Sequence, residues 1–110
     1  MAEIKRTTDR NRAIQAMMMD GEQLKTFYRF VANNPHIPLH DACQIVIARP
    51  SVSVCFSFEE WNAQGRRVTK GRKGISYYDG DGNKYFVFDV TDTHGENRYR
   101  RAAQPVKKIL

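Results

Sequence analysis

Apolar residues recur at helical spacing through the first third of the chain. From Asp9 onward they fall three or four residues apart and so share one stripe of a helix: Ile14, Met17, Met18, Leu24, Phe27, Tyr28 and Val31. Asp20-Gly21 interrupts this stripe, either as a break between two helices or as a kink within one. We favour one long helix that ends near Ala32, and we expect Met17 to Met19 to belong to the core.

A second helix and a strand are predicted after the loop at residues 33–38. Pro38 suits the first turn of the helix, and Pro50 ends it because the residue before a proline is pushed out of the helical region. This helix carries an apolar stripe of Leu39, Ala42, Cys43, Val46 and Ile47. Strict alternation from Ser51 to Phe58 then predicts a half-buried strand, whose apolar side contains Val52, Val54, Phe56 and Phe58.

Residues 58–64 carry the end signals of a short helix. Ser57 and Glu60 form the S-x-x-E pattern of a capping box, in which each side chain accepts a hydrogen bond from the other residue's backbone N–H. Phe56 and Trp61 occupy the two positions of a hydrophobic staple, so we expect Trp61 to pack in the core rather than stack on a base. Gly65 follows at the position where helices commonly end in a left-handed residue.

Two further strands, at residues 74–78 and 84–90, form a predicted hairpin. The connection at residues 79–83 reads D-G-D-G-N, which is typical of a turn. It resembles a calcium-binding loop, but Lys84 and Val90 occupy the positions where such a loop needs glycine and glutamate, so we interpret it as a plain turn. Alternation separates two partly apolar faces of the second strand: Phe86, Phe88 and Val90 on one, and Tyr85, Val87 and Asp89 on the other.

These elements predict an α+β domain over residues 9–95, with two or three helices packed on a small, mostly antiparallel β-sheet. The 110 residues suffice for one domain with a core, and 41% hydrophobic and 27% charged residues are typical of a soluble globular protein. We expect residues 1–8 to be a flexible N-terminus and residues 96–110 to be a basic tail or linker. Cys43 and Cys55 lie in apolar patterns and are expected to be buried, reduced thiols.

Two sequence features bear on location. No apolar run approaches the roughly 20 residues of a membrane span. The N-terminal residues MAEIKRTTDR also lack the apolar segment of a signal peptide. We therefore expect a cytoplasmic protein without a membrane partner.

The distribution of charge is the first indication of a binding partner. The net charge of +6 favours an anionic partner, nucleic acid before an anionic membrane surface, although charge that serves only solubility is an alternative. Five cations and no acid lie between Gly65 and Ile75: Arg66, Arg67, Lys70, Arg72 and Lys73. We predict that these side chains contact phosphates.

Tyrosines lie beside this basic segment, on the predicted hairpin. Aromatic faces next to cations are typical of surfaces that bind single-stranded nucleic acid, because every base has a face that can stack. Tyr77 alternates with Ile75 and is expected in the core, whereas Tyr78 is the better candidate for stacking and Tyr85 the second.

The sequence offers little that would support catalysis. His36, His40 and His94 match neither H-E-x-x-H nor another zinc-binding spacing, and the sequence contains neither G-x-S-x-G nor a phosphate-binding P-loop. We therefore expect a protein that is not an enzyme and that has no cofactor, metal or small-molecule substrate.

Several sequence blocks occur in a set order between Phe27 and Gly95. A leading helix is followed by Ala48-Arg49-Pro50, by Phe58 with Trp61, by G-R-R-V-T-K-G-R-K-G-I at 65–75, and by V-F-D-V-T-D-T-H-G at 87–95. In this order they resemble the N-terminal domain of the ArdC antirestriction proteins, which conjugative plasmids and related mobile elements encode. The last two blocks are the most specific part of the resemblance.

The resemblance implies sequence-nonspecific, non-catalytic binding of single-stranded DNA. In ArdC-like proteins a metallopeptidase domain with H-E-x-x-H follows, and we expect this chain to be either one domain of a longer protein or a stand-alone module. The alternative function is a protein-interaction module that inhibits a restriction enzyme or recruits a DNA-transfer protein. DNA binding at two salt concentrations separates these two hypotheses.

Overall fold

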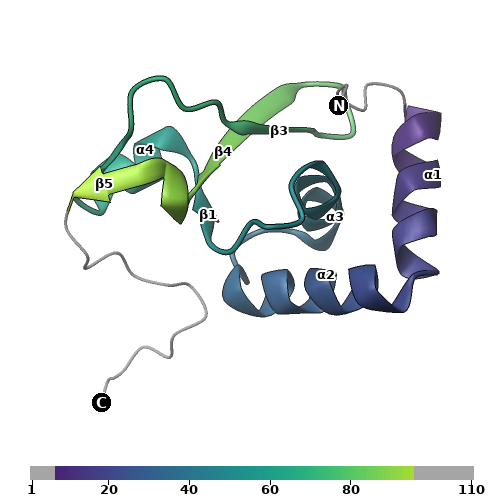
Figure 1. The fold of residues 1–110 in the computed structure, drawn as a ribbon. Coiled ribbons are helices and arrows are strands. Elements are labelled where there is room, and N and C mark those ends of the chain that lie inside the picture. The colour runs from purple at the N-terminus through teal and green to yellow at the C-terminus, as the bar shows by residue number, and fades with distance from the viewer. Residues whose placement is uncertain (1–6, 96–110) are drawn as a thin grey trace, which may run out of the picture.

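The computed structural model describes residues 7–95, which form four α-helices, five β-strands and one 3-10 helix (Figure 1). The helices are α1 Thr7–Met18, α2 Gly21–Asn33, α3 Leu39–Ala48 and α4 Phe58–Ala63. The strands are β1 Cys55–Phe56, β2 Arg66–Val68, β3 Ile75–Tyr78, β4 Lys84–Asp89 and β5 Thr93–Gly95, with the 3-10 helix η1 Val90–Asp92 before β5. The predicted flexible N-terminus covered residues 1–8, but α1 begins at Thr7, so the prediction is wrong for Thr7 and Thr8. Residues 1–6 and the predicted basic tail at 96–110 lie outside the described residues.

Two antiparallel sheets confirm the predicted α+β class. The larger sheet has three strands in the order β1-β4-β3, and its β3–β4 pair is the predicted hairpin. The smaller sheet consists of β2 and β5. This second pairing differs from the prediction, which placed residues 66–68 in a loop.

The larger sheet separates two groups of buried side chains. On one face α1, α2 and α3 form what we call the helical core, with the buried residues Met17, Phe27, Phe30, Ala42, Cys43, Ile45, Val46, Val52, Cys55, Ile75 and Val87. On the other face the Trp61 core consists of Val54, Phe56 and Trp61, with Val68, Phe88 and Val90 partly buried against it. Successive strand residues point to opposite faces, so Val87 enters the helical core while Phe88 packs against the Trp61 core.

The single long helix predicted from Asp9 to Ala32 is wrong, because the chain breaks at Met19 and Asp20 into α1 and α2. Asp20 is the N-cap of α2, and its side chain accepts a hydrogen bond from the Gln23 backbone N–H at 3.0 Å. This bond satisfies a donor that every helix start leaves unpaired, and so stabilises a new start at this point. The two helices run in different directions in Figure 1, and both contribute to the helical core.

The break in the helix also decides where the three methionines lie. Met17 is 1% exposed, whereas Met18 and Met19 are 40% and 83% exposed. The prediction that all three belong to the core is therefore correct for Met17 alone. Met17 lies on the face of α1 that packs into the core, Met18 ends the helix about 100° around its axis from Met17, and Met19 follows after the helix.

The strand predicted from Ser51 to Phe58 is reduced to the two residues of β1. Before β1, the backbone of Ser53 bonds to side chains instead of a strand: its N–H donates to Asp89 Oδ1 at 2.7 Å, and its carbonyl accepts from Asn34 Nδ2 at 2.8 Å. After β1, Phe58 begins α4 and is 48% exposed. Of the predicted apolar side, only Val54 and Phe56 pack together, in one cluster with Trp61, whereas Val52 packs on the opposite side with Cys55 and Phe58 is exposed.

The predictions that rested on local signals are confirmed. Helix α3 lies between Pro38 and Pro50, and both halves of the capping box are present at 2.8 Å and 3.1 Å between Ser57 and Glu60. The Phe56 and Trp61 rings meet edge to face with centroids 5.0 Å apart, and Trp61 is fully buried. Cys43 and Cys55 are free and buried, and burial raises the pKa of both thiols.

Candidate nucleic-acid interface

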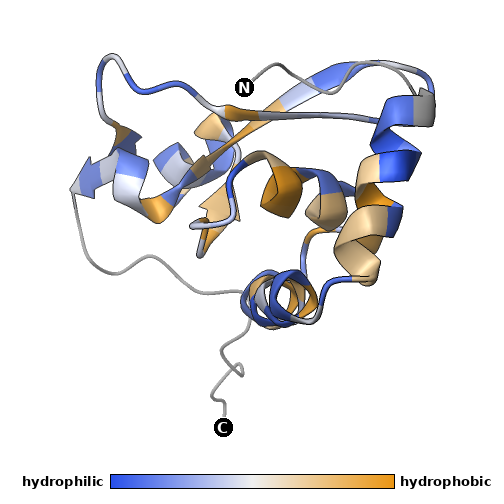
Figure 2. Cartoon of the chain, turned by 45° about the vertical axis from the view of Figure 1, so that its right-hand side comes forward, coloured by the Kyte–Doolittle hydropathy of each residue, from blue (hydrophilic) through white to orange (hydrophobic). Residues whose placement is uncertain are grey.

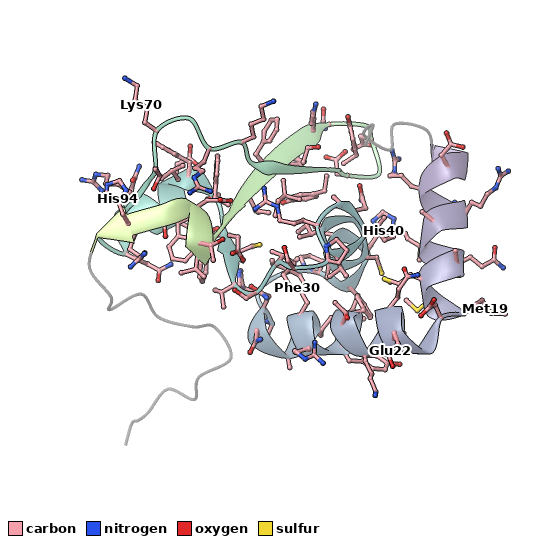
Figure 3. All side chains as sticks on the ribbon, viewed as in Figure 1. Met19, Glu22, Phe30, His40, Lys70 and His94 are labelled. Carbon is pink, nitrogen blue, oxygen red and sulfur yellow. The ribbon has the colours of Figure 1, made fainter. Side chains whose placement is uncertain are left out.

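The candidate interface begins with the loop of residues 69–73, which joins β2 to β3. Thr69 N donates to Asp92 O at 2.8 Å, and Arg72 N donates to Thr69 O at 3.1 Å, so the loop is a tight turn attached to η1. Gly71 adopts a φ of 88°, a conformation that favours glycine. Lys70, Arg72 and Lys73 are exposed, and Figure 3 shows Lys70 pointing away from the protein body.

Arg66 does not join these exposed cations, contrary to its prediction as a phosphate contact. Its side chain is buried, its Nε donates to Thr93 Oγ1 at 2.8 Å, and its Nη2 donates to Thr93 O at 3.2 Å. The guanidinium carbon also lies 6.0 Å from the centroid of the Trp61 ring. Arg66 therefore links β5 to the Trp61 core, which removes it from the surface.

The neighbouring Arg67 remains a candidate for a phosphate contact. It is exposed on β2, opposite His94 of β5, and its Nη1 donates a 3.3 Å hydrogen bond to Asn62 Oδ1. A guanidinium has five N–H donors, so this bond leaves further donors for a ligand. Alternation along β2 explains why two adjacent arginines differ in burial.

The second part of the interface is the portion of the sheet face that the Trp61 core leaves uncovered. Strand register pairs Tyr78 with Lys84 and Ser76 with Phe86, which places these four side chains on one face of the hairpin. Phe88 lies on the same face, two residues beyond Phe86, but packs against the Trp61 core. Phe86 itself is 49% exposed. The uncovered face thus presents an aromatic ring to solvent.

The basic loop and the uncovered face adjoin each other. A Cβ added to Gly74, directly after the loop, would lie 3.1 Å from the Cβ of Phe86, so the backbone passes close beside this ring. On the other side, Lys84 Nζ lies 5.4 Å from the centroid of the Phe86 ring and 5.9 Å from that of Tyr78. The exposed ring therefore has the ammonium group of Lys84 on one side and the backbone that follows the basic loop on the other.

Phe86 and Lys84 were missed as candidate site residues, although the sequence contains a signal for them. A connection of five residues, 79–83, places Lys84 directly opposite Tyr78, as observed. Alternation then puts Phe86 on the face of Tyr78. The two faces of the strand at residues 84–90 were predicted correctly. It was not worked out, however, which of these faces lies on the same side of the hairpin as Tyr78.

Only part of the Tyr78 ring is accessible for stacking on a base. Its ring is half-buried, with the guanidinium carbon of Arg10 at 5.3 Å on α1 and Lys84 Nζ at 5.9 Å. Its backbone is fixed by Gln44, whose Oε1 accepts from Tyr78 N at 2.9 Å and whose Nε2 donates to Tyr78 O at 2.8 Å. Tyr78 is therefore well positioned but partly covered, and Phe86 is the more accessible ring.

Tyr85 lies on the opposite face of the hairpin from Tyr78. It pairs with Tyr77, the two rings stack with centroids 5.6 Å apart, and Tyr77 packs against the helical core as predicted. The Tyr85 hydroxyl donates to Asp79 Oδ2 at 3.0 Å, and this bond raises the pKa of Tyr85. The structure does not bring Tyr85 together with Tyr78, so the two tyrosines cannot belong to one continuous stacking surface.

The arrangement suits a ligand that carries phosphates and exposed rings. Arg67, Lys70, Arg72, Lys73 and Lys84 are exposed cations, and no acid interrupts the sequence from residue 66 to residue 78. Figure 2 shows that the loop is hydrophilic, while hydrophobic residues concentrate where sheet and helices meet. Phosphate groups would contact the cations, and an unstacked base could stack on the exposed ring of Phe86.

Other kinds of site find less support in residues 7–95. No group of three or more histidine, cysteine, aspartate or glutamate side chains in this range could bind a metal ion. The three histidines lie on separate segments: Nε2 of His36 is 2.8 Å from Cys55 O, His40 contacts Gln44 on α3, and His94 contacts Thr69. None of the helices in the described range has the length and apolar character needed to cross a membrane.

Comparisons of the chain with protein-family models, curated proteins and solved structures gave no match. The resemblance to the ArdC N-terminal domain therefore rests on the sequence blocks at residues 48–50, 58–61, 65–75 and 87–95 and stays a prediction. The function has to be argued from the chemistry of the interface.

Proposed function

We propose that this protein binds single-stranded DNA without sequence preference and without catalysis. The observation that carries the proposal is the exposed ring of Phe86, with Lys84 beside it and the backbone at the end of the exposed basic loop, residues 69–73, passing close to it. Cations that follow a backbone next to an aromatic platform are the usual features of single-strand binding. The side chains in the proposed contact are Phe86, Tyr78, Arg67, Lys70, Arg72, Lys73 and Lys84.

The exposed ring is the reason to propose a single strand rather than a duplex. A base can stack on Phe86 only if its own face is free, and the bases inside a duplex are stacked on one another. Contacts to phosphates and ring faces also carry little sequence information, so binding should be similar for different sequences.

The sequence resemblance adds a biological setting to this proposal. We place the protein among antirestriction functions of mobile elements, acting in the cytoplasm, either as one domain of a longer protein or as a module by itself. The binding chemistry does not depend on this setting and can be tested without it.

The test is DNA binding measured by fluorescence anisotropy over a series of salt concentrations. Each phosphate contact on a single strand contributes about 0.7 to the slope of log affinity against log salt, so three to five contacts predict a slope of roughly −2 to −3.5. Changing Arg72 and Lys73 together to alanine should flatten this slope by about 1.4 and weaken binding equally for all sequences.

A matched control removes the same charge from a different surface. Arg12 on α1 and Lys25 on α2 are both exposed, and their double change to alanine should leave the salt slope unchanged. Equal slopes for the Arg72/Lys73 variant and the parent protein would contradict the proposed interface. Absence of binding at low salt would instead favour the alternative, a module that inhibits a restriction enzyme or recruits a transfer protein through protein contacts.

A further inference from the structure

Two arginines from distant segments meet at one buried carboxylate beneath the basic loop. The Asp92 side chain is 5% exposed; its Oδ2 accepts from Arg49 Nη1 at 2.8 Å and its Oδ1 accepts from Arg72 Nη1 at 3.3 Å. Arg72 belongs to the loop, whereas Arg49 is the C-cap of α3. The two guanidiniums therefore lie next to each other although one comes from outside the loop.

Arg49 is attached to the loop as well as to Asp92. Its Nη2 lies 3.4 Å from the carbonyl oxygen of Lys73, to which it donates. The loop is thus fixed from beneath at both ends, through Thr69 to the Asp92 backbone and through Lys73 to Arg49. This arrangement positions Arg49 at the edge of the same surface that presents Lys70, Arg72 and Lys73.

Both arginines keep part of their side chains in solvent. Arg49 is 32% exposed and Arg72 is 54% exposed, while the carboxylate between them is nearly inaccessible. A guanidinium carries five N–H donors, and the bonds described use two in Arg49 and one in Arg72. The remaining donors are those available to an incoming anion.

The charges of this cluster favour an anionic ligand. Of the three charged groups in contact, two are guanidiniums and one is a carboxylate, and the two like charges repel each other. Asp89, a second buried carboxylate three residues before Asp92, offsets part of the positive charge. One arginine would be enough to neutralise Asp92. A phosphodiester group would offset the remaining positive charge, and the planar fork of a guanidinium matches the oxygen atoms of a phosphate.

From this geometry we infer that Arg49 is a further phosphate contact, which extends the interface from the loop to the end of α3. Asp92 acts as a positioning residue that fixes Arg49 beside Arg72 before the ligand arrives. The inference rests on the proposed DNA-binding function and adds a binding residue that lies outside the basic segment.

The experiment is the salt dependence of binding to a fluorescent oligothymidine for two variants of Arg49. Arg49→Gln keeps hydrogen-bond donors near Asp92 but removes the charge, so the slope of log affinity against log salt should flatten by about 0.7. Arg49→Lys keeps the charge, and its slope should stay that of the parent protein. Arg12→Gln, which removes one exposed charge on α1, is the matched control and should not change the slope.

Thermal unfolding of the same variants separates binding from support of the fold. A purely structural role predicts that Arg49→Gln and Arg49→Lys lower the melting temperature while the salt slope stays that of the parent protein. That result would overturn the inference about Arg49. The proposed DNA binding would still stand if Arg72→Ala flattened the salt slope. If the parent protein failed to bind the oligonucleotide at all, the proposed function and this inference would both be wrong.

Discussion

The two cores on either side of the larger sheet differ in size and in what they support. The helical core contains eleven buried residues, ten from three helices and the three strands of that sheet, and Val52 from the connection between α3 and β1. The Trp61 core contains three, and Trp61 is its largest side chain. The larger core is shared among many side chains, whereas Trp61 is the largest of only three in the smaller core.

The proposed DNA-binding surface lies on the sheet face that carries the smaller core. The smaller core covers only part of the sheet face, which leaves Phe86 exposed, and it anchors β2 through the contact between Arg66 and Trp61. The helical core supports the same surface from behind, through the bonds of Gln44 to the Tyr78 backbone. The helical core holds the larger sheet in place, so the opposite face can stay partly uncovered and form the interface.

The largest expected effect comes from removing the centre of the smaller core. Trp61→Ala should lower the free energy of unfolding by about 3–5 kcal/mol, as for other buried aromatic residues, and it also removes the 2.8 Å bond from Trp61 Nε1 to Phe88 O. Phe30→Ala in the helical core should lower it by a similar amount. Urea unfolding measures both changes.

DNA binding should then distinguish the two variants. Measured at low temperature, where both variants are folded, affinity should fall for Trp61→Ala, because β2, which leads into the loop, loses its contact with the Trp61 core. Affinity should stay near that of the parent protein for Phe30→Ala. An unchanged stability with lost binding in Trp61→Ala would mean that Trp61 stacks on bases, contrary to its burial. Equal losses of affinity in both variants would remove the distinction between the two cores.

A smaller loss of stability is expected at the junction of α2 and β1. Asn34 is fully buried; its Nδ2 donates to Phe30 O and to Ser53 O, and its Oδ1 accepts from Cys55 N at 2.9 Å. Asn34→Ala leaves these backbone groups without their partner, which should lower the free energy of unfolding by about 1–3 kcal/mol. Thermal or urea unfolding measures the change.

The preceding residue provides the control for this prediction. Asn33→Ala removes the same side chain from the last residue of α2, where it is half-buried, and should change stability by no more than about 0.5 kcal/mol. Equal effects at both positions would show that the helix end, and not the Asn34 network, limits stability.

Asn34 also illustrates why parts of the fold could be predicted from the sequence and others could not. The capping box of α4 and the turn between β3 and β4 depend on residues within a few positions of one another, and both were predicted correctly. The end of the strand at Ser53 depends on Asn34 and Asp89, which lie far away in the sequence. Alternation in residues 51–58 carries no information about such partners.

The same reasoning applies to the candidate site. The exposed cations of residues 67–73 could be found because charge is a property of each residue, but the burial of Arg66 depends on Thr93, which β5 brings beside β2. Lys84 and Phe86 required the register of the hairpin, which the turn length fixes. Asp20 is a favourable N-cap residue and so indicated the start of a second helix. The apolar stripe continues past it, and this periodicity favoured the incorrect prediction of one long helix.

The two faces of the hairpin should differ in their effect on binding. Phe86→Ala should reduce the free energy of DNA binding by about 1–3 kcal/mol without changing the salt slope, because stacking releases no ions. Tyr85→Ala is the matched control, since Tyr85 is 44% exposed but lies on the opposite face. Fluorescence anisotropy at fixed salt measures both, and a larger loss in Tyr85→Ala would place the bases on the other side of the sheet.

The smallest expected effect concerns the hairpin turn, which lies outside both cores. Asp79 accepts hydrogen bonds from Asp81 N and Asn83 N at 2.9 Å, from Asn83 Nδ2 and from the Tyr85 hydroxyl, and these bonds lower the pKa of Asp79 to about 2. A carboxyl whose pKa is lower in the folded state than in the unfolded state stabilises the fold at higher pH. The contribution of Asp79 is therefore present above about pH 4 and is lost as the pH falls toward 2.

Carboxyl NMR should therefore show Asp79 titrating with a midpoint of about 2. Tyr85→Phe removes one of the four bonds but keeps the ring, so the midpoint should move up toward the ordinary aspartate value of about 3.9. Since Asp79 belongs to neither core, the amide shifts of residues 79–83 should follow this titration while the indole signal of Trp61 stays constant. If the Trp61 signal changed together with the turn, the hairpin tip and the Trp61 core would be a single cooperative unit, and the separation of interface from core would fail.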